Sequence, residues 1–570
     1  MLSMKKMISE AIMDEVRAMN PNAELDASAI ASMLEYPPDS NMGDLALPCF
    51  KLSKILRNAP VKIAATIAEH LSVPGLAKVE AVNGYLNLFL DGGALADRIV
   101  GEVLSKGEKY GAPDLGGGRT VVLDYSSPNV AKPFHIGHLG TTVIGHSLKK
   151  MHEFAGYRCV GINYLGDWGT QFGKLITAYR MWGNKEDIEA GGIDKLVELY
   201  VKFHEEAEKD PSLNDLARAE FRKLEDGDAA NIEIWQWFVQ ISLVEYKKTY
   251  AQLGIEFDSY KGESFYTDKM PAEVQKLRDM GLLKIDDGAS IVDLEAYGMP
   301  PCLILKRDGS TLYPTRDIAA AVYRKNTYDF DKAIYVTSAG QSLHFAQWFK
   351  VVEMMGYDFA DKLVHVPYGT VSINGAKLAT RTGNVILLRD LFALAIDKVA
   401  AIMEEKNPNL ADKDKIAEAV GVGAIVFYYL SNNRIRDINF IMEDALSFDG
   451  NTGPYVQYTY ARTCSVLAKS EKREREGALR ITAREETDLL KVICRFEETV
   501  RDAIDAYEPS IITRYILDLA GAYNRFYHNC SILGAEDETV RDTRLALTEA
   551  AKTVLGNAFD LICLAKTEKI

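Results

Sequence analysis

The sequence predicts an α/β fold: a doubly wound, Rossmann-type parallel sheet, preceded by an α+β N-terminal domain and followed by an all-α C-terminal helix bundle. A strand–helix–strand pattern fills residues 120–164 and returns at residues 333–366, and such units pair their strands in parallel. Two units of this kind make a doubly wound sheet. From about residue 390 onward, apolar residues recur at helical spacing almost throughout.

The first of these units is the clearer one. Residues 120–125 (TVVLDY) form a β-branched run, which indicates a buried strand. Apolar positions over residues 136–155 then follow a helical period, and Gly156 suits the end of that helix. Residues 158–164 (RCVGINY) supply the second strand. The later unit repeats this order, with Gly356 closing its helix.

Changes of pattern along the chain indicate separate structural parts. Residues 79–91 alternate like a hairpin around Asn83-Gly84, which places strands as well as helices near the N-terminus. The expected parts are an N-terminal domain (1–112), a catalytic domain (113–390) with a helical insertion (about 180–260), a connecting helical segment (391–451) and a C-terminal helical domain (452–570).

Composition excludes several classes of protein. A chain of 570 residues needs more than one hydrophobic core, and 47% hydrophobic with 26% charged residues is typical of a soluble globular protein. The longest apolar run, residues 419–430, is shorter than the roughly 20 residues of a membrane span, so no membrane association is expected. Acidic residues follow Lys5 and Lys6 where a secretory signal needs an apolar stretch, which favours a cytoplasmic location.

The cysteines and the net charge exclude further kinds of site and partner. Seven cysteines lie far apart without a Cys-x-x-Cys pair, so we expect neither a disulfide framework nor structural zinc, and we assign no metal ligands. The net charge of −15 argues against binding nucleic acid without regard to its sequence. It permits a local basic footprint, because phosphate contacts act only within a Debye length of ~8–10 Å.

The turn after the first strand, residues 126–138 (SSPNVAKPFHIGH), carries the strongest chemical signal. The N-terminus of the next helix presents free N–H groups and partial positive charge, which suit a phosphate chain. His135 and His138 add donors that can follow charge as it builds between the α- and β-phosphates, so we assign them as catalytic. Gly137 permits close approach of the nucleotide, and Pro133, Gly137 and His138 are the candidate ATP contacts of this turn. A chance His-x-Gly-His is the alternative, but it seldom falls at the start of a βαβ helix.

A basic loop at residues 377–384 (KLATRTGN) is the second signal, because it follows a strand at the sheet edge where ligands bind. Taken alone, a basic loop is more often simply exposed to solvent than part of a binding site. Together with the histidine turn, Lys377 and Arg381 become candidate catalytic residues that clamp the departing pyrophosphate, and Thr380 a candidate ATP contact.

With these motifs in view, the chain resembles class I arginyl-tRNA synthetases. The matching stretches run in the family's order: SSPNVAKPFHIGHLG, NYLGDWGTQFGKL, KGES, YPTRD, SAGQSLHFAQWF, ATRTGN and TGPYVQYTYAR. The resemblance implies that ATP, accompanied by Mg²⁺, activates L-arginine and that the arginyl group then moves to the 3′ end of tRNA(Arg). It also implies that the N-terminal unit contacts the tRNA elbow and that the C-terminal bundle binds the anticodon. We expect a monomer.

An arginine pocket needs carboxylates that meet a planar guanidinium in a bidentate way. By the match to KGES and YPTRD, Glu263 and Asp317 fill that need, and Tyr313 packs beside the aliphatic stem. A surface charge is the commoner fate of either carboxylate taken alone. The resemblance implies further contacts, with the α-amino and carboxylate groups of arginine from Asn129 and Gln341, and with adenosine from His344. His344 could instead be an ordinary helix histidine.

Lys132 is a further candidate catalytic residue. The usual class I loop, Lys-Met-Ser-Lys, carries a second lysine where this chain has Thr380, so another cation should face the leaving pyrophosphate. Lys132 lies three residues before His135 and can reach in that direction; a solvated lysine is the alternative.

Aromatic residues on the C-terminal helices are candidate tRNA contacts. Tyr455, Tyr458 and Arg462 fall on one helical face, and Tyr523 and Tyr527 form a second pair at a spacing of four. Splayed anticodon bases stack on rings and guanidinium planes. The alternative is that tyrosines on a helix face belong to the core.

Three competing functions remain open at this point. A class I synthetase for another amino acid would need a different pocket, since an acidic pocket is wrong for glutamate and the zinc-ligand cysteines of the cysteine enzyme are missing. A nucleotidylyltransferase with the same histidine tetrapeptide seldom needs 570 residues or a helical C-terminal domain. An inactive tRNA-binding relative would not need the intact tetrapeptide and both carboxylates.

Overall fold

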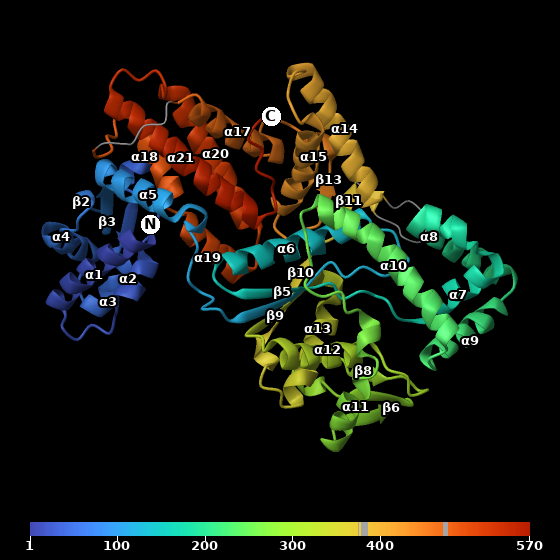
Figure 1. Cartoon of the computed structure of the whole chain (residues 1–570). Coiled ribbons are helices and arrows are strands. Elements are labelled where there is room, and N and C mark those ends of the chain that lie inside the picture. Colours follow the sequence, from blue (N-terminus) through green and yellow to red (C-terminus); the bar gives the residue numbers. More distant parts are fainter. Residues whose placement is uncertain (374–375, 378–385, 471–476) are drawn as a thin grey trace.

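A computed structural model describes residues 1–373, 376–377, 386–470 and 477–570. The N-terminal domain lies beside the C-terminal helices, and the parallel sheet occupies the centre of the molecule (Figure 1). The inserted helices extend to one side, and a small antiparallel sheet lies at the opposite end from the C-terminal helices.

The N-terminal domain packs helices against a three-stranded sheet of order β1-β3-β2. Its hairpin turns at Asn83 (φ 51°) and Gly84 (φ 85°), left-handed conformations that favour these two residue types, so the hairpin is confirmed. On α1, Ile8 and Ile12 are fully buried in the hydrophobic core. The elements are α1 (Leu2–Met19), α2 (Ala27–Met33), β1 (Leu45–Pro48), α3 (Ser53–Leu56), α4 (Pro60–His70), β2 (Leu76–Val82), β3 (Tyr85–Leu90) and α5 (Gly92–Lys106).

The central sheet is parallel throughout, with strand order β10-β9-β4-β5. Sequence order therefore reverses between β4 and β9, which makes the sheet doubly wound as the sequence predicts. Burial of all five residues of β4 explains its unbroken apolar run. The elements are β4 (Thr120–Asp124), α6 (Leu139–Phe154), β5 (Arg158–Ile162), α12 (Tyr313–Tyr328), β9 (Lys332–Ser338), α13 (Ser342–Met354) and β10 (Leu363–Tyr368).

Between the two halves of the sheet, the chain forms inserted helices and then a small sheet. The helices α7–α10 agree with the helical stretch that the sequence predicts. The antiparallel sheet β6-β7-β8 is not apparent from the sequence, because its strands have four residues each and Ile285 is 74% exposed. The elements are α7 (Thr170–Trp182), α8 (Lys185–Lys209), α9 (Leu213–Glu225), α10 (Ala229–Gln252), α11 (Met270–Asp279), β6 (Leu283–Asp286), β7 (Ala289–Val292) and β8 (Cys302–Leu305).

From residue 386 onward, the described residues form helices and one short strand, β13. β13 pairs in parallel with β11 and so ties the connecting segment to the catalytic domain. The elements are β11 (Val371–Ile373), β12 (Ala376–Lys377), α14 (Leu388–Lys406), α15 (Lys413–Leu430), β13 (Ile438–Phe440), α16 (Met442–Ala445), α17 (Gly453–Ala468), α18 (Arg484–Ile493), α19 (Phe496–Ala506), α20 (Ser510–Asn529) and α21 (Glu538–Leu561).

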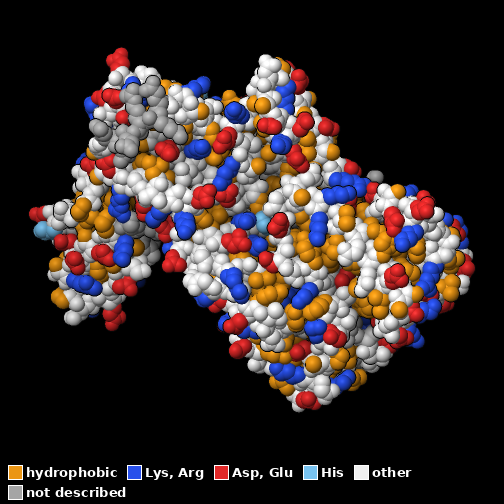
Figure 2. Space-filling view, in the orientation of Figure 1, with side chains coloured by type: hydrophobic (Ala, Val, Ile, Leu, Met, Phe, Trp, Pro, Cys, Tyr) orange, Lys and Arg blue, Asp and Glu red, His pale blue; other side chains and the backbone are white. Residues whose placement is uncertain are grey.

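Ion pairs join the N-terminal domain to the C-terminal helices. Lys5 Nζ lies 2.5 Å from Glu498 Oε1, and the Tyr36 hydroxyl donates to Glu498 Oε2 at 2.6 Å. Lys491 pairs with Asp44 in the same region. On the face shown in Figure 2, basic and acidic side chains are interspersed. None of the described helices is long and apolar enough to cross a membrane.

Candidate active site

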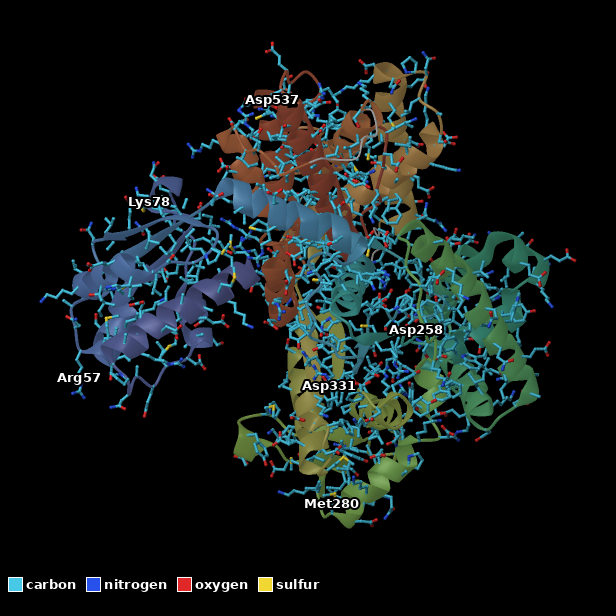
Figure 3. All side chains as sticks on the ribbon, turned by 60° about the vertical axis from the view of Figure 1, so that its left-hand side comes forward. Arg57, Lys78, Asp258, Met280, Asp331 and Asp537 are labelled. Carbon is cyan, nitrogen blue, oxygen red and sulfur yellow. The ribbon has the colours of Figure 1, made fainter. Side chains whose placement is uncertain are left out.

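A cavity of about 550 Å³ opens at the carboxyl ends of the parallel strands. Asp124 from β4, Ser338 from β9 and Tyr368 from β10 line it, so it occupies the edge where doubly wound sheets bind ligands. The structure brings seven of the sequence-predicted residues to this cavity: Asn129, His138, Glu263, Tyr313, Asp317, Gln341 and His344. In the stick view of Figure 3, Asp258 and Asp331 mark the sheet region, whereas Arg57 and Lys78 mark the N-terminal domain.

Backbone geometry fixes the two histidines of the turn as neutral donors. The Gly137 N–H donates to His135 Nδ1 at 3.0 Å, and the His135 N–H donates to His138 Nδ1 at 3.2 Å. A neutral imidazole that accepts at Nδ1 carries its proton on Nε2. Burial lowers the pKa of both rings, to about 3 for His138, and the nearby Lys132 charge lowers each further. Each ring therefore presents an Nε2–H donor at neutral pH.

Other residues of the same turn lie beside the cavity. Lys132 is exposed, and Pro133, His135 and Gly137 are half-buried and do not line the cavity themselves. The His135 ring lies 3.9 Å from that of His138, measured between centroids. Phe134 stacks on His138, with ring centroids 5.0 Å apart and an interplanar angle of 12°. The second histidine is thus held by stacking as well as by its hydrogen bond.

The chain that follows the basic loop contacts this turn. Lys377 belongs to β12, which pairs antiparallel with β11, whereas Thr380 and Arg381 lie outside the described residues. On the C-terminal side of the loop, the Ile386 carbonyl accepts from the Ile136 N–H at 3.3 Å. The N–H of Leu388 donates to the carbonyl of Phe134 at 2.9 Å.

The carboxylates predicted for the arginine pocket each have a cationic or histidine partner within the chain. Glu263 Oε2 accepts from Arg316 Nη1 at 2.6 Å, and both side chains are largely buried. Asp317 Oδ2 lies 2.6 Å from His344 Nε2. Burial raises the pKa of Glu263 to about 7, although Arg316 opposes that rise. A carboxylate has about four lone-pair sites, so either group can still accept from a second guanidinium.

Tyr313, the first residue of α12, is 65% exposed at the mouth of the cavity. His344, the residue expected to contact adenosine, contacts Asp317 of the expected arginine pocket. The two expected binding regions are therefore adjacent. Sequence reasoning did not identify Arg316, although it lies inside the YPTRD motif next to Asp317.

A buried ion pair forms the floor of the cavity, and the sequence did not reveal it. Arg324 Nη2 lies 2.8 Å from Asp124 Oδ2, with only 1% and 9% of the two side chains exposed. The Arg324 guanidinium also faces the rings of Tyr164 and Tyr335, at 5.1 and 5.6 Å from their centroids. The only signal in the sequence was an aspartate at the end of the first strand.

Asp167 and Trp168 hold the loop that leads to Glu263. Asp167 accepts from the backbone N–H and the hydroxyl of Ser264, at 2.8 and 2.7 Å. A Cβ on Gly262 would lie 2.5 Å from the Asp167 carboxylate, so only glycine fits there. The Trp168 ring packs edge-on against Trp235. These contacts fix the segment that delivers Glu263 to the cavity.

With this geometry established, comparison with known proteins decides the family. Residues 99–442 match the sequence model of the class I (R) tRNA synthetase catalytic domain, residues 456–570 that of the DALR anticodon binding domain, and residues 3–90 that of the arginyl tRNA synthetase N terminal domain. The chain is 49% identical over 573 residues to the arginine–tRNA ligase of Alkaliphilus metalliredigens, and the match covers 100% of both chains. The chain belongs to the arginyl-tRNA synthetase family.

Further relatives of the arginyl-tRNA synthetase family agree. The arginine–tRNA ligase of Clostridium perfringens is 48% identical over 569 residues, which are 99% of this chain and 100% of that one. The arginyl-tRNA synthetase of Thermus thermophilus superposes with a TM-score of 0.82 at 25% identity, covering 99% of each chain. That of Plasmodium falciparum shares the fold, with a TM-score of 0.82 at 23% identity over 100% and 99% of the two chains. The predicted fold class and family are confirmed.

In this synthetase family member, the C-terminal helices present a small aromatic face made of Tyr458, Arg462 and Tyr527. The Arg462 guanidinium lies 5.1 Å from the Tyr458 centroid and 4.9 Å from that of Tyr527. The two rings are 43% and 38% exposed. Arg462 also donates to Asn524, which in turn donates to the Tyr455 hydroxyl at 2.9 Å.

Tyr523 corrects the sequence interpretation. The sequence pairs it with Tyr527 as a second tRNA contact, but its side chain is fully buried. It packs within the C-terminal helices, where it contacts Phe526 and Tyr527. A ring in that position cannot stack on a base from outside.

Proposed function

We propose that this protein is an arginine–tRNA ligase, which activates L-arginine with ATP and transfers the arginyl group to the 3′ end of tRNA(Arg). The observation that carries the proposal is the composition of one cavity. Glu263 and Asp317 line it together with His138 of the helix-terminal turn. A guanidinium and a triphosphate need those two kinds of surface side by side.

The first step joins arginine to the α-phosphate of ATP. A carboxylate oxygen of arginine attacks the α-phosphorus, the bond from that phosphorus to the bridging oxygen breaks, and pyrophosphate leaves. Charge builds on the α- and β-phosphate oxygens as the bond breaks. The Nε2–H groups of His135 and His138 are neutral donors for that charge, and the phosphates would raise the pKa of both rings.

The second step transfers the arginyl group. A ribose hydroxyl of the terminal adenosine attacks the arginyl carbonyl, an ester forms, and AMP leaves with the oxygen that joined it to the carbonyl. The hydroxyl proton is lost in this step. Each bond made is matched by one broken, so the phosphoanhydride of ATP drives formation of the ester.

Selectivity for arginine follows from the paired charges of the pocket. The Asp317 and Glu263 carboxylates present oxygens to a planar fork of donors, which lysine lacks. Arg316 helps to keep Glu263 ionised despite its burial. Tyr313 would cover the aliphatic stem, and Asn129 and Gln341 would bind the α-amino and carboxylate groups.

Lys132 supplies the cation that the loop lacks at Thr380. Its side chain is exposed on the turn, and its charge lowers the pKa of both histidines. Lys377 and Arg381 would close over the pyrophosphate from the other side, and Thr380 and His344 would contact ATP. Mg²⁺ would arrive with the triphosphate and neutralise part of its charge.

The remaining domains bind tRNA in this proposal. Tyr455, Tyr458, Arg462 and Tyr527 receive anticodon bases, and the N-terminal domain (1–112) contacts the elbow. In the order of the chain, the catalytic domain (113–390) and the connecting segment (391–451) follow the N-terminal domain and precede the C-terminal domain (452–570). The protein works as a monomer in the cytoplasm.

ATP–pyrophosphate exchange with each of the twenty amino acids, with and without total tRNA, tests the proposal. We expect exchange with arginine alone, and only when tRNA is present. Strong exchange with a different amino acid would remove the arginine assignment. Exchange without tRNA would remove only the requirement for tRNA.

A further inference from the structure

The turn that carries the histidines is strained. Ser126, Ser127 and Ala131 have φ angles of 69°, 47° and 58°, a region that residues other than glycine seldom adopt. Such a conformation is unfavourable for these residues and persists only where its surroundings hold it. The contacts that impose this conformation therefore help to set the position of the catalytic groups.

One face of the inserted helix α10 supplies much of that support. Ser242, Tyr246 and Tyr250 are spaced four residues apart, and all three are essentially fully buried against the turn. In Figure 1 this long helix runs from the centre of the molecule outward to α7 and α9. Burial raises the pKa of both phenols far above the ordinary value, so they remain neutral donors.

Tyr246 holds the middle of the turn. Its hydroxyl lies 2.7 Å from the carbonyl oxygens of both Asn129 and Lys132, so one hydrogen is shared between them. Ser242 donates its own hydrogen to the Phe238 carbonyl and accepts the N–H of Ala131 at 3.0 Å. Ala131, which has a left-handed backbone, is thus held at its own N–H and through the carbonyls of Asn129 and Lys132.

Tyr250 holds the beginning and the end of the turn through a chain of hydrogen bonds whose direction can be deduced. Thr142 donates to the carbonyl of His138 at 2.7 Å, so its oxygen accepts from Ser126 at 2.8 Å. Ser126 then accepts from Tyr250 at 2.7 Å, and Tyr250 accepts from the Asn163 amide at 2.9 Å. Each hydroxyl has one hydrogen, so the chain runs from Asn163 to His138.

We propose that α10 positions the catalytic turn, and that Tyr246 and Tyr250 are positioning residues for the activation of the amino acid. The phenols touch neither substrate nor reacting atoms. They act through Asn129, Lys132 and His138, whose backbone carbonyls they hold directly or through Ser126 and Thr142. This inference rests on the proposed function and deepens it.

α10 is itself anchored to the helix that follows the basic loop. Glu245 Oε1 accepts from Arg389 Nη1 at 3.1 Å, and Arg389 on α14 also pairs with Asp194 of α8 at 2.8 Å. Glu245 is the residue immediately before Tyr246. The turn is therefore held by hydroxyls of α10 and, through Ile386 and Leu388, by the start of the chain that leads into α14.

The test is Tyr246→Phe, which removes the hydrogen shared by the two carbonyls while keeping the ring. We expect kcat for arginine-dependent pyrophosphate exchange to fall roughly 10- to 100-fold, because small displacements of catalytic groups have effects of that size. The KM values for ATP and arginine should stay within about threefold. The matched control is Tyr515→Phe, since that buried phenol also donates to a backbone carbonyl, Val492 at 3.1 Å, within the C-terminal helices.

A kcat within about twofold of wild type in folded Tyr246→Phe, or an equal loss in Tyr515→Phe, would overturn the inference. If Tyr246→Phe fails to fold, Ser242→Ala is judged by the same criteria. If wild type shows no arginine-dependent exchange, the proposed function fails, and hydrogen–deuterium exchange of residues 126–138 decides the inference alone. Faster exchange there in Tyr246→Phe, but not in Tyr515→Phe, supports it, and unchanged exchange overturns it.

Discussion

The cavity at the sheet edge and the aromatic face of the C-terminal helices both contain an arginine, but its surroundings differ. In the cavity, Arg316 pairs with Glu263 and only 12% and 15% of the two side chains are exposed. On the aromatic face, Arg462 lies between two rings that are 43% and 38% exposed. Charge interactions are stronger away from water, so the cavity can select by charge, whereas the aromatic face offers ring area for stacking.

The largest effect is expected from removing charge in the cavity. Asp317→Asn and Glu263→Gln should each weaken arginine use by about 2–4 kcal/mol, roughly 30- to 900-fold in kcat/KM, because a desolvated guanidinium loses a charge-assisted partner. The KM for ATP should remain nearly unchanged. Steady-state exchange measures both quantities. An arginine KM within about twofold of wild type would show that the residue does not bind arginine.

Lys132→Ala should have the next largest effect. A preorganised cation at the leaving pyrophosphate contributes about 2–4 kcal/mol to the transition state and little to bound ATP. We therefore expect kcat for activation to fall about 100-fold with the KM for ATP little changed. Single-turnover formation of the adenylate measures it. A rate within about threefold of wild type would make Arg381 the next candidate.

A smaller effect is expected from pH. Because the pKa of Glu263 is raised to about 7, the ionised form dominates above that pH and is lost as the pH falls below it. Between pH 8 and pH 6 the ionised fraction drops about tenfold, so the KM for arginine should rise by a similar factor. The same titration of Glu263→Gln should be flat. A pH-independent KM in wild type would contradict the role of Glu263.

On the aromatic face, Tyr527→Ala should raise the KM for tRNA about fivefold or more, since stacking on one base is worth at least about 1 kcal/mol. The matched variant Tyr523→Phe changes a buried ring on the same helix and should leave that KM unchanged. Aminoacylation at varied tRNA concentration measures both. Equal effects of the two substitutions would indicate a change in helix packing rather than lost stacking.

The sequence was sufficient for the parts of the site that lie within one motif. The turn at residues 126–138 can be recognised because a strand precedes it and a helix follows it. The order of the central sheet follows from the two βαβ units. Helical spacing likewise put Tyr458 and Arg462 on one face. These features depend on neighbours in the chain, so local patterns are enough to find them.

Features that depend on distant partners could not be predicted in the same way. Asp124 on β4 and Arg324 on α12 form the cavity floor from distant parts of the chain, and neither residue has a distinctive local pattern. The four-residue spacing of Ser242, Tyr246 and Tyr250 is visible in the sequence, but nothing near it reveals the turn that they hold. Tyr523 and Tyr527 share a spacing too, and only the packing of neighbouring helices decides that Tyr523 is the buried one.

Comparison of arginine with citrulline in tRNA-dependent exchange tests most directly the claim that the cavity selects its substrate by charge. Citrulline keeps the length and planarity of arginine but replaces the guanidinium with a neutral urea. With citrulline, the Glu263 and Asp317 carboxylates would lack the cation of the substrate and keep only their contacts with Arg316 and His344. We expect kcat/KM for citrulline to be lower by at least about 100-fold at pH 8, because the two buried carboxylates lose their charge-assisted contacts with the substrate. Values for the two substrates within about tenfold of each other would contradict the account.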